Sequence, residues 1–283
     1  MSEEVWHHQK TKQAGFSVIE LMIATLLGLF IIGGIIGVFL SSSNNYRLQS
    51  AISQVQEKGR FALRKIRIDI QKAGYYIDPA EDQVLIEYRS VGSAADFGID
   101  ATEILSIYRR GDGGSPNTIH RTSYFLVRGT DGTQALHRHA VADISVPVTA
   151  PWMGQELVTG VARMNYRFAA DLTSTASVVS DEITRSVDWI PLSGGVFSAY
   201  LDASELMALS DFSADTTKAW NTVRAVQVEL VVASDEDFVV DTPQKINLPN
   251  PFDVAASAAS AGLSVNQYFQ AYTTTYALRN RVE

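Results

Sequence analysis

Residues 15–40 read GFSVIELMIATLLGLFIIGGIIGVFL, an almost unbroken apolar run that begins directly after a glycine. From Phe16 to Leu40 there are 25 residues and a single ionisable group, Glu20. About 20 apolar residues are enough for a helix to cross the hydrocarbon core of a bilayer. The run is too long for the apolar region of a secretory signal peptide, and no small-residue cleavage site follows it. It therefore predicts a membrane-spanning helix.

The position of Glu20 within this run indicates a function. A charged side chain at such a depth costs roughly 2.5–3.5 kcal/mol on insertion scales, so an acidic residue there needs a reason to be present. A short hydrophilic leader with Lys10 and Lys12 precedes Gly15. The apolar run then starts with an aromatic residue, Phe16, and Glu20 is the fifth residue after the glycine.

This order of residues resembles the type IV prepilin signature. The resemblance implies that a membrane aspartyl peptidase cleaves after Gly15 and that the new amino terminus, Phe16, is N-methylated. It also implies that Glu20 recruits neighbouring subunits, by pairing with the terminal amine of the next chain in a low-dielectric bundle of helices. The alternative is an ordinary signal anchor that happens to contain a glutamate.

Composition limits the remaining functional classes. The net charge of −8 argues against non-specific nucleic-acid binding, which requires basic surfaces. The chain has no cysteine, which excludes cysteine-ligated zinc, a thiol nucleophile and a redox pair. Many pilins close a C-terminal loop with a disulfide. This chain departs from that pattern, so its fold must be held by packing alone.

The apolar run does not end the helix. Beyond the polar residues 41–45, apolar residues recur mostly at steps of three, four or seven, which is one face of a helix. No proline occurs before Pro79 to break it. We predict one helix from Phe16 to Ala73, closed by Gly74 as a C′ glycine, with its second half packed on a globular head. The residues of this apolar stripe are Leu48, Ile52, Val55, Ala62, Ile66, Ile70 and Ala73.

Charged residues between Arg47 and Arg67 mostly occupy the other faces of this helix. They indicate a solvated face, with attraction to anionic lipid as the alternative. Four glycines, Gly28, Gly33, Gly34 and Gly37, interrupt the membrane half. These glycines have three possible interpretations. The pair Gly33-x-x-x-Gly37 can allow another helix to approach closely, or the cluster can be a weak point at which the helix extends when the subunit enters a filament. Alternatively, the glycines reflect only the general frequency of glycine in membrane helices.

The second half of the helix resembles the PilW family of minor pilins. Residues 55–62 read Val-Gln-Glu-Lys-Gly-Arg-Phe-Ala, and residues 69–75 read Asp-Ile-Gln-Lys-Ala-Gly-Tyr. Together with the prepilin start, the resemblance covers about 60 contiguous residues. It is weaker over 157–168, 223–233 and the C-terminus, and it is absent from 170–222.

After Gly74 the pattern changes to alternation and short apolar runs, typical of strands. A long helix followed by antiparallel strands predicts an α+β protein, in which the helix packs on an antiparallel β-sheet head as in pilins. Residues 170–222 are interpreted as insertion and loop, with a short helix at 203–209. The expected strands cover 104–109, a hairpin of 121–128 and 134–139, one long strand at 157–168, then 223–233 and 272–277.

No catalytic motif is present: there is no Gly-x-Ser-x-Gly elbow, phosphate-binding loop, dinucleotide fingerprint or His-Glu-x-x-His. His137 and His139 share a strand face; an exposed pair is favoured over a metal site. The Asp112 and Asp131 segments are interpreted as plain turns rather than calcium loops, and 235–237 as a solvated loop. We expect no catalytic residues, no cofactor and no metal.

The sequence therefore predicts a minor pilin that takes part in type IV pilus assembly, in a tip or priming complex. The expected partners are the prepilin peptidase, other minor pilins, the major pilin and a tip adhesin, with no nucleic acid. The expected location is the inner membrane, with a single pass and a periplasmic head, and then the surface pilus. The boundaries are a leader at 1–15, a transmembrane and filament-core helix at 16–40, an amphipathic half at 41–74 and a β-rich head at 75–283.

Two alternatives remain. A minor pseudopilin of a type II secretion system would share the same start and architecture. A membrane-anchored periplasmic enzyme or sugar-binding domain would instead require a polar cleft with converging carboxylates or histidines.

Overall fold

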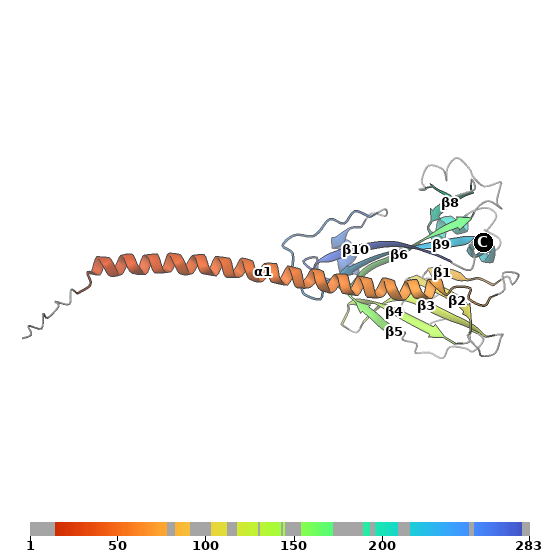
Figure 1. Cartoon of the computed structure of the whole chain (residues 1–283), viewed down its shortest axis with the longest axis horizontal. Coiled ribbons are helices and arrows are strands. Elements are labelled where there is room, and N and C mark those ends of the chain that lie inside the picture. Colours follow the sequence, from red (N-terminus) through yellow and green to blue (C-terminus); the bar gives the residue numbers. More distant parts are fainter. Residues whose placement is uncertain are drawn as a thin grey trace, which may run out of the picture. The chain divides into compact units, whose positions relative to one another are not determined.

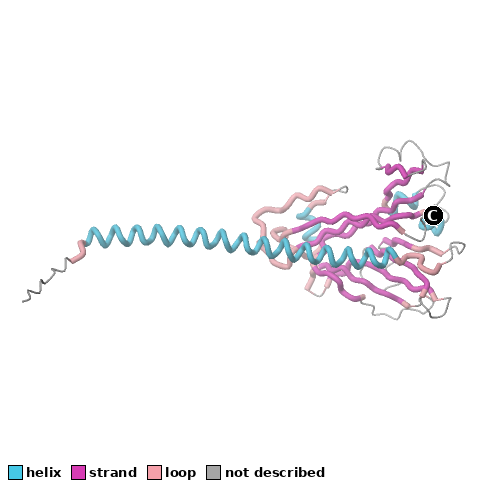
Figure 2. Tube along the Cα trace, viewed as in Figure 1, coloured by secondary structure: helices cyan, strands magenta, loops and turns pink. Residues whose placement is uncertain are grey.

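The computed structural model describes residues 15–77, 83–90, 103–111, 118–129, 131–142, 144, 154–171, 189–192, 196–208, 216–248 and 252–278. The chain divides into two compact units, one up to Arg47 and one from Leu48 onward. Helices and strands are drawn in Figures 1 and 2. The helices are α1 (Val18–Gln71), α2 (Ala203–Ala208), α3 (Thr216–Asn221) and α4 (Val254–Ser260). The strands are β1 (Ile86–Ser90), β2 (Glu103–Arg110), β3 (Ile119–Arg128), β4 (Gln134–Val141), β5 (Gln155–Thr159), β6 (Val161–Asp171), β7 (Trp189–Leu192), β8 (Val196–Leu201), β9 (Val223–Ala233) and β10 (Phe269–Ala277).

The predicted long helix is confirmed, with ends that differ by two residues at each side. Ser17 caps the start: its hydroxyl accepts a hydrogen bond from the Ile19 amide, and its carbonyl accepts one from Leu21. The helix runs through the polar residues 41–45 without a break. After the last helical residue, Gly74 adopts a left-handed φ of 72° and its amide donates to the Tyr108 carbonyl at 2.8 Å. The glycine thus turns the chain toward β2, as a residue with no Cβ can.

The strands form two five-stranded antiparallel sheets rather than the single sheet expected. The first sheet has the order β1-β2-β3-β4-β5, a simple meander, and the second has the order β10-β9-β6-β8-β7. The predicted hairpin of β3 and β4 is confirmed, with Leu126 opposite Leu136. The α+β class is confirmed, because one long helix packs with antiparallel strands.

The prediction of one strand over 157–168 is wrong. The chain leaves the first sheet at Thr159 and enters the second at Val161, so this segment is β5 followed by β6. Gly160 lies between them with φ 74°, a conformation that favours glycine. Its amide donates to the Gln134 carbonyl of β4, and its carbonyl accepts from the Ala233 amide of β9. One glycine therefore links the two sheets.

The interpretation of 170–222 as insertion and loop is also wrong. The region carries β7 and β8, which extend the second sheet beyond β6, and the helices α2 and α3. The short helix expected at 203–209 is confirmed as α2. The segments β1 and α4 were not predicted; α4 is capped by Asp253, whose carboxylate accepts from the Ala255 and Ala256 amides.

The buried face of α1 from Leu48 onward lies in the main core together with residues of both sheets. Burying each large aliphatic side chain contributes about 1.5–3 kcal/mol. The stripe differs from the prediction at its first two positions, since Leu48 and Ile52 are only half-buried and Ala51 is buried instead. Its buried residues are Ala51, Val55, Gly59, Ala62, Ile66 and Ile70, with Ala73 just beyond the helix.

Strand β9 separates this core from a smaller one, because its side chains alternate between two faces. Val228 and Leu230 belong to the main core, whereas Val231 and Ala233 pack with α4 and Phe252 in a second cluster. The second sheet is therefore covered on both faces near β9, by α1 on one side and by α4 on the other.

Polar contacts fix the register of α1 on the two sheets. Asp69 accepts from the Tyr124 hydroxyl of β3 at 2.6 Å and from Nε and Nη2 of Arg138 of β4 at 2.7 and 3.2 Å. On the other side, two tyrosines of β10 donate to helix carbonyls: Tyr272 to Val55 at 3.0 Å, and Tyr276 to Leu63 at 3.1 Å. Hydrogen bonds to a charged group contribute about 1.5–3 kcal/mol each and neutral ones about 0.5–1.5 kcal/mol.

One prediction of a solvated residue needs correction at this interface. Lys58 is not part of a solvated face: its side chain is 15% exposed, it pairs with Asp235, and it donates to the Thr159 carbonyl. Asp235 and Glu236 are exposed in the loop after β9, as expected, although the Asp235 amide also donates to the Gln54 side chain at 2.9 Å. The other charged residues, Arg60, Arg64, Lys65 and Arg67, are exposed as expected.

The unit from Leu48 onward should fold without the residues before it. We expect a chain that begins at Leu48 to be soluble and to unfold cooperatively in urea. A chain that begins at Tyr75 should aggregate, because it exposes the core surface that the helix covers. Size-exclusion chromatography and urea unfolding followed by tryptophan fluorescence measure both. A cooperatively folded monomer from Tyr75 onward would contradict this account of the helix.

Gly59 of α1 packs directly against Tyr272 of β10. A Cβ added there would lie 2.3 Å from the ring of Tyr272, whose hydroxyl is held by Val55. We expect Gly59→Ala to lower the free energy of unfolding by about 1–2 kcal/mol, because overpacking exceeds the gain in helix propensity. Gly37→Ala is the matched control, since no atom lies within 4 Å of its added Cβ. The cost should disappear in a Tyr272→Ala background; an equal cost there would show that the ring is not responsible.

Candidate functional site

The residues predicted for processing and recruitment lie at the start of the first unit. Gly15 and Phe16 precede the helix and are exposed, Phe16 by 85%. Glu20 lies in the first turn, three residues after the capping Ser17. A carboxylate there interacts favourably with the positive end of the helix dipole, typically by 0.3–1 kcal/mol at exposed sites. The structure thus adds a local role for Glu20 that the sequence prediction did not include.

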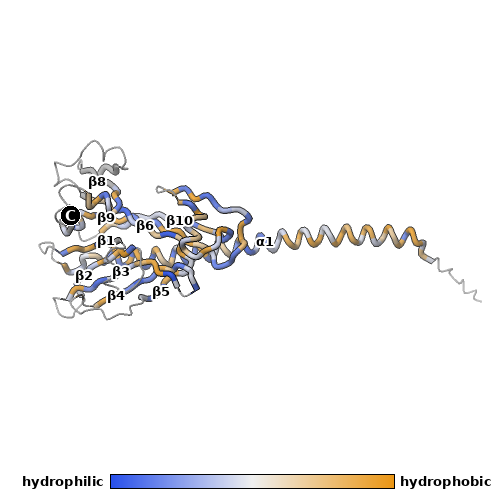
Figure 3. Tube along the Cα trace, turned by 180° about the vertical axis from the view of Figure 1, so that it is seen from behind, coloured by the Kyte–Doolittle hydropathy of each residue, from blue (hydrophilic) through white to orange (hydrophobic). Residues whose placement is uncertain are grey.

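The side chains from Phe16 to Leu40, at and before the start of α1 and along its first part, form an apolar surface that the described part of the chain leaves uncovered. The large ones are between 53% and 85% exposed. Figure 3 shows this part of the helix as a predominantly apolar segment. Among the described residues, α1 is the one helix long and apolar enough to cross a membrane. Such a surface requires lipid or partner helices.

The four glycines of this segment leave the helix intact. Gly28, Gly33, Gly34 and Gly37 all lie within α1, and a Cβ added at any of them meets no atom within 4 Å. The surface around Gly33 and Gly37 is therefore open to a neighbouring helix. The three interpretations of these glycines remain predictions, since one chain does not distinguish them.

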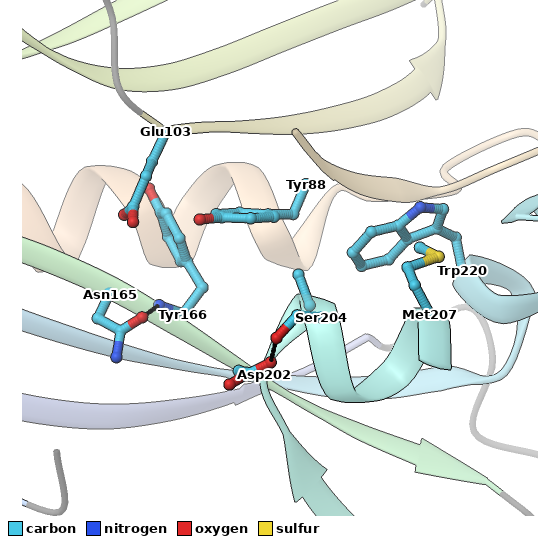
Figure 4. A pocket seen from close by; sticks show the side chains of 9 residues that line it. Tyr88, Glu103, Asn165, Tyr166, Asp202, Ser204, Met207 and Trp220 are labelled. Atoms are coloured by element: carbon cyan, nitrogen blue, oxygen red, sulfur yellow. Dashed lines mark hydrogen bonds between the residues drawn. The ribbon is translucent and has the colours of Figure 1, made fainter. Parts of the chain in front are cut away.

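The second unit contains a cavity of about 370 Å³ between the two sheets. Tyr88 of β1 and Glu103 of β2 line it from the first sheet, and Tyr166 of β6, α2 and Trp220 of α3 complete it (Figure 4). Burial, together with the nearby Glu103 carboxylate, raises the pKa of the Tyr88 hydroxyl. Burial also raises the pKa of Glu103, although its hydrogen bond with Tyr88 and the Arg163 charge oppose the shift.

The carboxylates of this cavity are already engaged in the fold. Glu103 holds the Tyr88 hydroxyl, and Asp202 caps α2 by accepting from the Glu205 amide at 2.8 Å and the Ser204 hydroxyl at 2.6 Å. The cavity brings acids and aromatic rings together, which the sequence did not reveal. It does not arrange them as a nucleophile with an adjacent base.

The prediction of an exposed histidine pair is wrong for His137. Its side chain is buried, stacks on Phe125 with ring centroids 6.0 Å apart, and lies with Nδ1 3.3 Å from the Gly154 carbonyl. His139 is half-buried. Within the described residues no group of three or more potential ligands could hold a metal ion. Asp131 forms the expected turn by accepting from the Thr133 amide, and Asp112 lies outside the described residues.

Comparisons with known proteins identify the family. The model of a family described as type IV pilus-assembly protein W matches residues 123–280, more than half of the chain. The chain therefore belongs to this family, whose members act together with other components of the pilus. The match includes residues 170–222, where no resemblance was predicted, and does not include the helix on which the predicted resemblance was strongest.

The other comparisons add little. No curated protein sequence matches the chain. Among solved structures, a type IV-like pilin from Thermus thermophilus is 11% identical, covers 81% of this chain and 99% of that chain, and has a TM-score of 0.41. This similarity is too low to support an argument, so the assignment rests on the family match.

Stability should depend on the protonation of His139. Burial, and then the charges of Arg121 and Arg138, lower its pKa to about 4, whereas an unfolded histidine titrates near 6.5. Between these values the unfolded chain binds more protons, so stability should fall as the pH is lowered from about 6.5 to about 4. Urea unfolding at about pH 7.5 and about pH 5 should show a smaller pH dependence for His139→Gln than for the original chain. The same dependence in both would refute this role.

Proposed function

We propose that this chain is a minor pilin that enters a type IV pilus in a tip or priming complex with other minor pilins. The proposal is carried by the combination of two features. The globular part of the chain matches the pilus-assembly family, and the first half of the long helix before it is apolar and exposed, with Glu20 as its one charged residue. Uncovered apolar helices associate in lipid or in a helical bundle, and a single carboxylate can define their axial offset. The proposed role is structural rather than catalytic.

Processing would begin at the exposed segment before α1. Hydrolysis of the Gly15–Phe16 bond leaves a carboxylate on the discarded leader and a free amine on Phe16, which is then methylated. The non-helical, exposed position of these two residues supports access by a peptidase. The part of the leader before Gly15 lies outside the described residues.

Recruitment would use the same end of the helix. The Phe16 amine carries positive charge next to the positive end of the helix dipole, which is unfavourable without a nearby anion. Glu20 of the same chain or of a neighbour can supply that anion. Pairing with a neighbour in a low-dielectric bundle makes one axial offset far more stable than the others, because a misplaced subunit leaves both charges uncompensated.

The proposed topology follows from the anchor. Residues 16–40 would span the inner membrane once and later form the filament core, while residues 75–283 would form a periplasmic head covered by the amphipathic half at 41–74. The proposed partners are the prepilin peptidase, other minor pilins, the major pilin and a tip adhesin. A minor pseudopilin of a secretion system is the second candidate, since it would use the same helix in the same way.

The decisive variant is Glu20→Ala. It removes a costly charge from the bilayer, so membrane insertion and cleavage should be unchanged or better. Partner co-purification and surface pili should be largely lost, because the charge pair is gone. Glu20→Asp should be intermediate, since the charge remains but its reach is shorter. Membrane fractionation, mass spectrometry of the amino terminus, affinity purification and pilus counts provide the readouts.

Two controls make the result specific. Thr25→Ala changes a polar residue of the same helix. The Thr25 hydroxyl donates to the Met22 carbonyl of the same helix at 2.9 Å, so the Thr25→Ala variant should assemble normally. Gly15→Val should block cleavage and gives the unprocessed reference. Normal piliation in Glu20→Ala would refute the recruitment mechanism, and an intact Met1 terminus in peptidase-competent cells would refute the processing step.

A further inference from the structure

A groove lies in the second unit where the flank of α1 meets the edge strand β10. Its volume is about 520 Å³. The helix contributes one wall and β10 the other, with Tyr272 and Tyr276 reaching across to helix carbonyls. The lining residues are Gln56, Arg60, Leu63, Arg64, Arg67, Gln270, Tyr272, Thr274 and Tyr276.

Three arginines give this groove its charge. Arg60, Arg64 and Arg67 follow one flank of the helix, at steps of four and three residues, and all are exposed. None of them forms an ion pair with a residue that the structure describes, unlike Arg138 and Lys58 on the same interface. A row of uncompensated cations on a chain of net charge −8 marks this groove as a site for an anion.

The other wall is a strand edge. Within the described sheets, β10 has a single neighbouring strand, β9. The backbone N–H and C=O groups of every second residue of β10 therefore point away from the sheet. The strand runs alongside the helix in the same direction. From Tyr272 to Tyr276 it advances by about 14 Å, and their partners Val55 and Leu63 are about 12 Å apart along the helix.

We propose that this groove binds an extended acidic segment of another pilus component, which adds as a strand to the edge of β10. Side chains on one face of an extended chain repeat every 6.8 Å or so. The arginines are spaced by about 6 Å and about 4.5 Å along the helix. Carboxylates at alternate positions of the segment would therefore meet successive guanidinium groups. The identification of the partner as a pilus component rests on the proposed function. The prediction that the bound segment is acidic and extended rests on the groove alone.

The geometry favours a peptide over a lipid headgroup. Recognition of anionic lipid typically uses a cluster of about four to eight lysines or arginines directly next to a membrane helix, whereas this groove holds three, the first of them 20 residues after Leu40. Here the cations share a groove with unpaired backbone groups of a strand, which is the arrangement that peptides use for strand addition. The backbone bonds would give affinity, and the arginines would give specificity for acidic side chains.

The test uses the full-length protein in non-ionic detergent micelles and fluorescence anisotropy. The probe is a labelled octapeptide of alternating glutamate and threonine. Two further probes have glutamine in place of glutamate, or an N-methylated backbone that cannot donate hydrogen bonds. We expect the acidic peptide to bind, and both others to bind about tenfold more weakly or not at all.

Charge-matched variants locate the site. Arg60→Gln with Arg64→Gln should weaken binding of the acidic peptide by about tenfold. Lys65→Gln with Lys72→Gln removes two exposed charges outside the groove, one from α1 and one directly after its last residue, and should leave binding nearly unchanged. Circular dichroism confirms that both variants fold.

Several outcomes would overturn the proposal. Equal losses in the two double variants would mean that only net charge matters. Undiminished binding of the N-methylated peptide would exclude strand addition. Binding of short-chain phosphatidylglycerol without binding of the acidic peptide would make the groove a lipid site. The peptide assay uses purified protein, so a failure of peptide binding would not affect the result of the Glu20→Ala assembly experiment. A failure of the Glu20→Ala prediction would likewise leave the peptide-binding result valid.

Discussion

The packing of one helix face against two sheets is the constraint on which the second unit depends. The stripe from Ala51 to Ile70 fills the space that both sheets border, and without it each sheet would expose an apolar face. The contact is close enough at Gly59 that no side chain fits beneath Tyr272. Such proximity leaves little freedom in the position of the helix, because interiors are close-packed. A slip of one residue, with the rotation of about 100° that accompanies it, would place Arg60 where Gly59 lies.

Polar contacts complete this positioning at both sides of the helix. Asp69 is held by Tyr124 and Arg138 of the first sheet, while Lys58 is held by Asp235 after β9. Removing Arg138 would leave the mostly buried Asp69 carboxylate without its charged partner, which costs far more than the pair contributes. The apolar stripe therefore supplies most of the stabilisation, and the ionic contacts select one register of the helix.

The same helix carries out two tasks that require opposite surfaces. From Leu48 onward it hides its apolar residues in the protein's own core, and before Leu40 it presents them outward for lipid or neighbouring helices. Its charges follow the same division. Glu20 stands alone in the apolar half, whereas Arg60, Arg64 and Arg67 gather beside the open edge of β10. The proposed subunit selection through Glu20 and the proposed recognition at the groove therefore use different parts of the helix, so mutation can test them separately.

The sequence by itself determined the long helix, its apolar half with Glu20 near its start, the β3–β4 hairpin and β9. These features are encoded locally, by period, by charge and by the lack of proline, so they can be recognised without knowing what packs on them. Only the tertiary structure decided that Gly160 divides 157–168 between two sheets, that β7 and β8 extend the second sheet, that His137 is buried and that Lys58 pairs with Asp235. The cavity beside Tyr88 and the groove beside β10 also depend on residues far apart in the chain. Burial and pairing are set by non-local contacts, which short-range sequence patterns do not record.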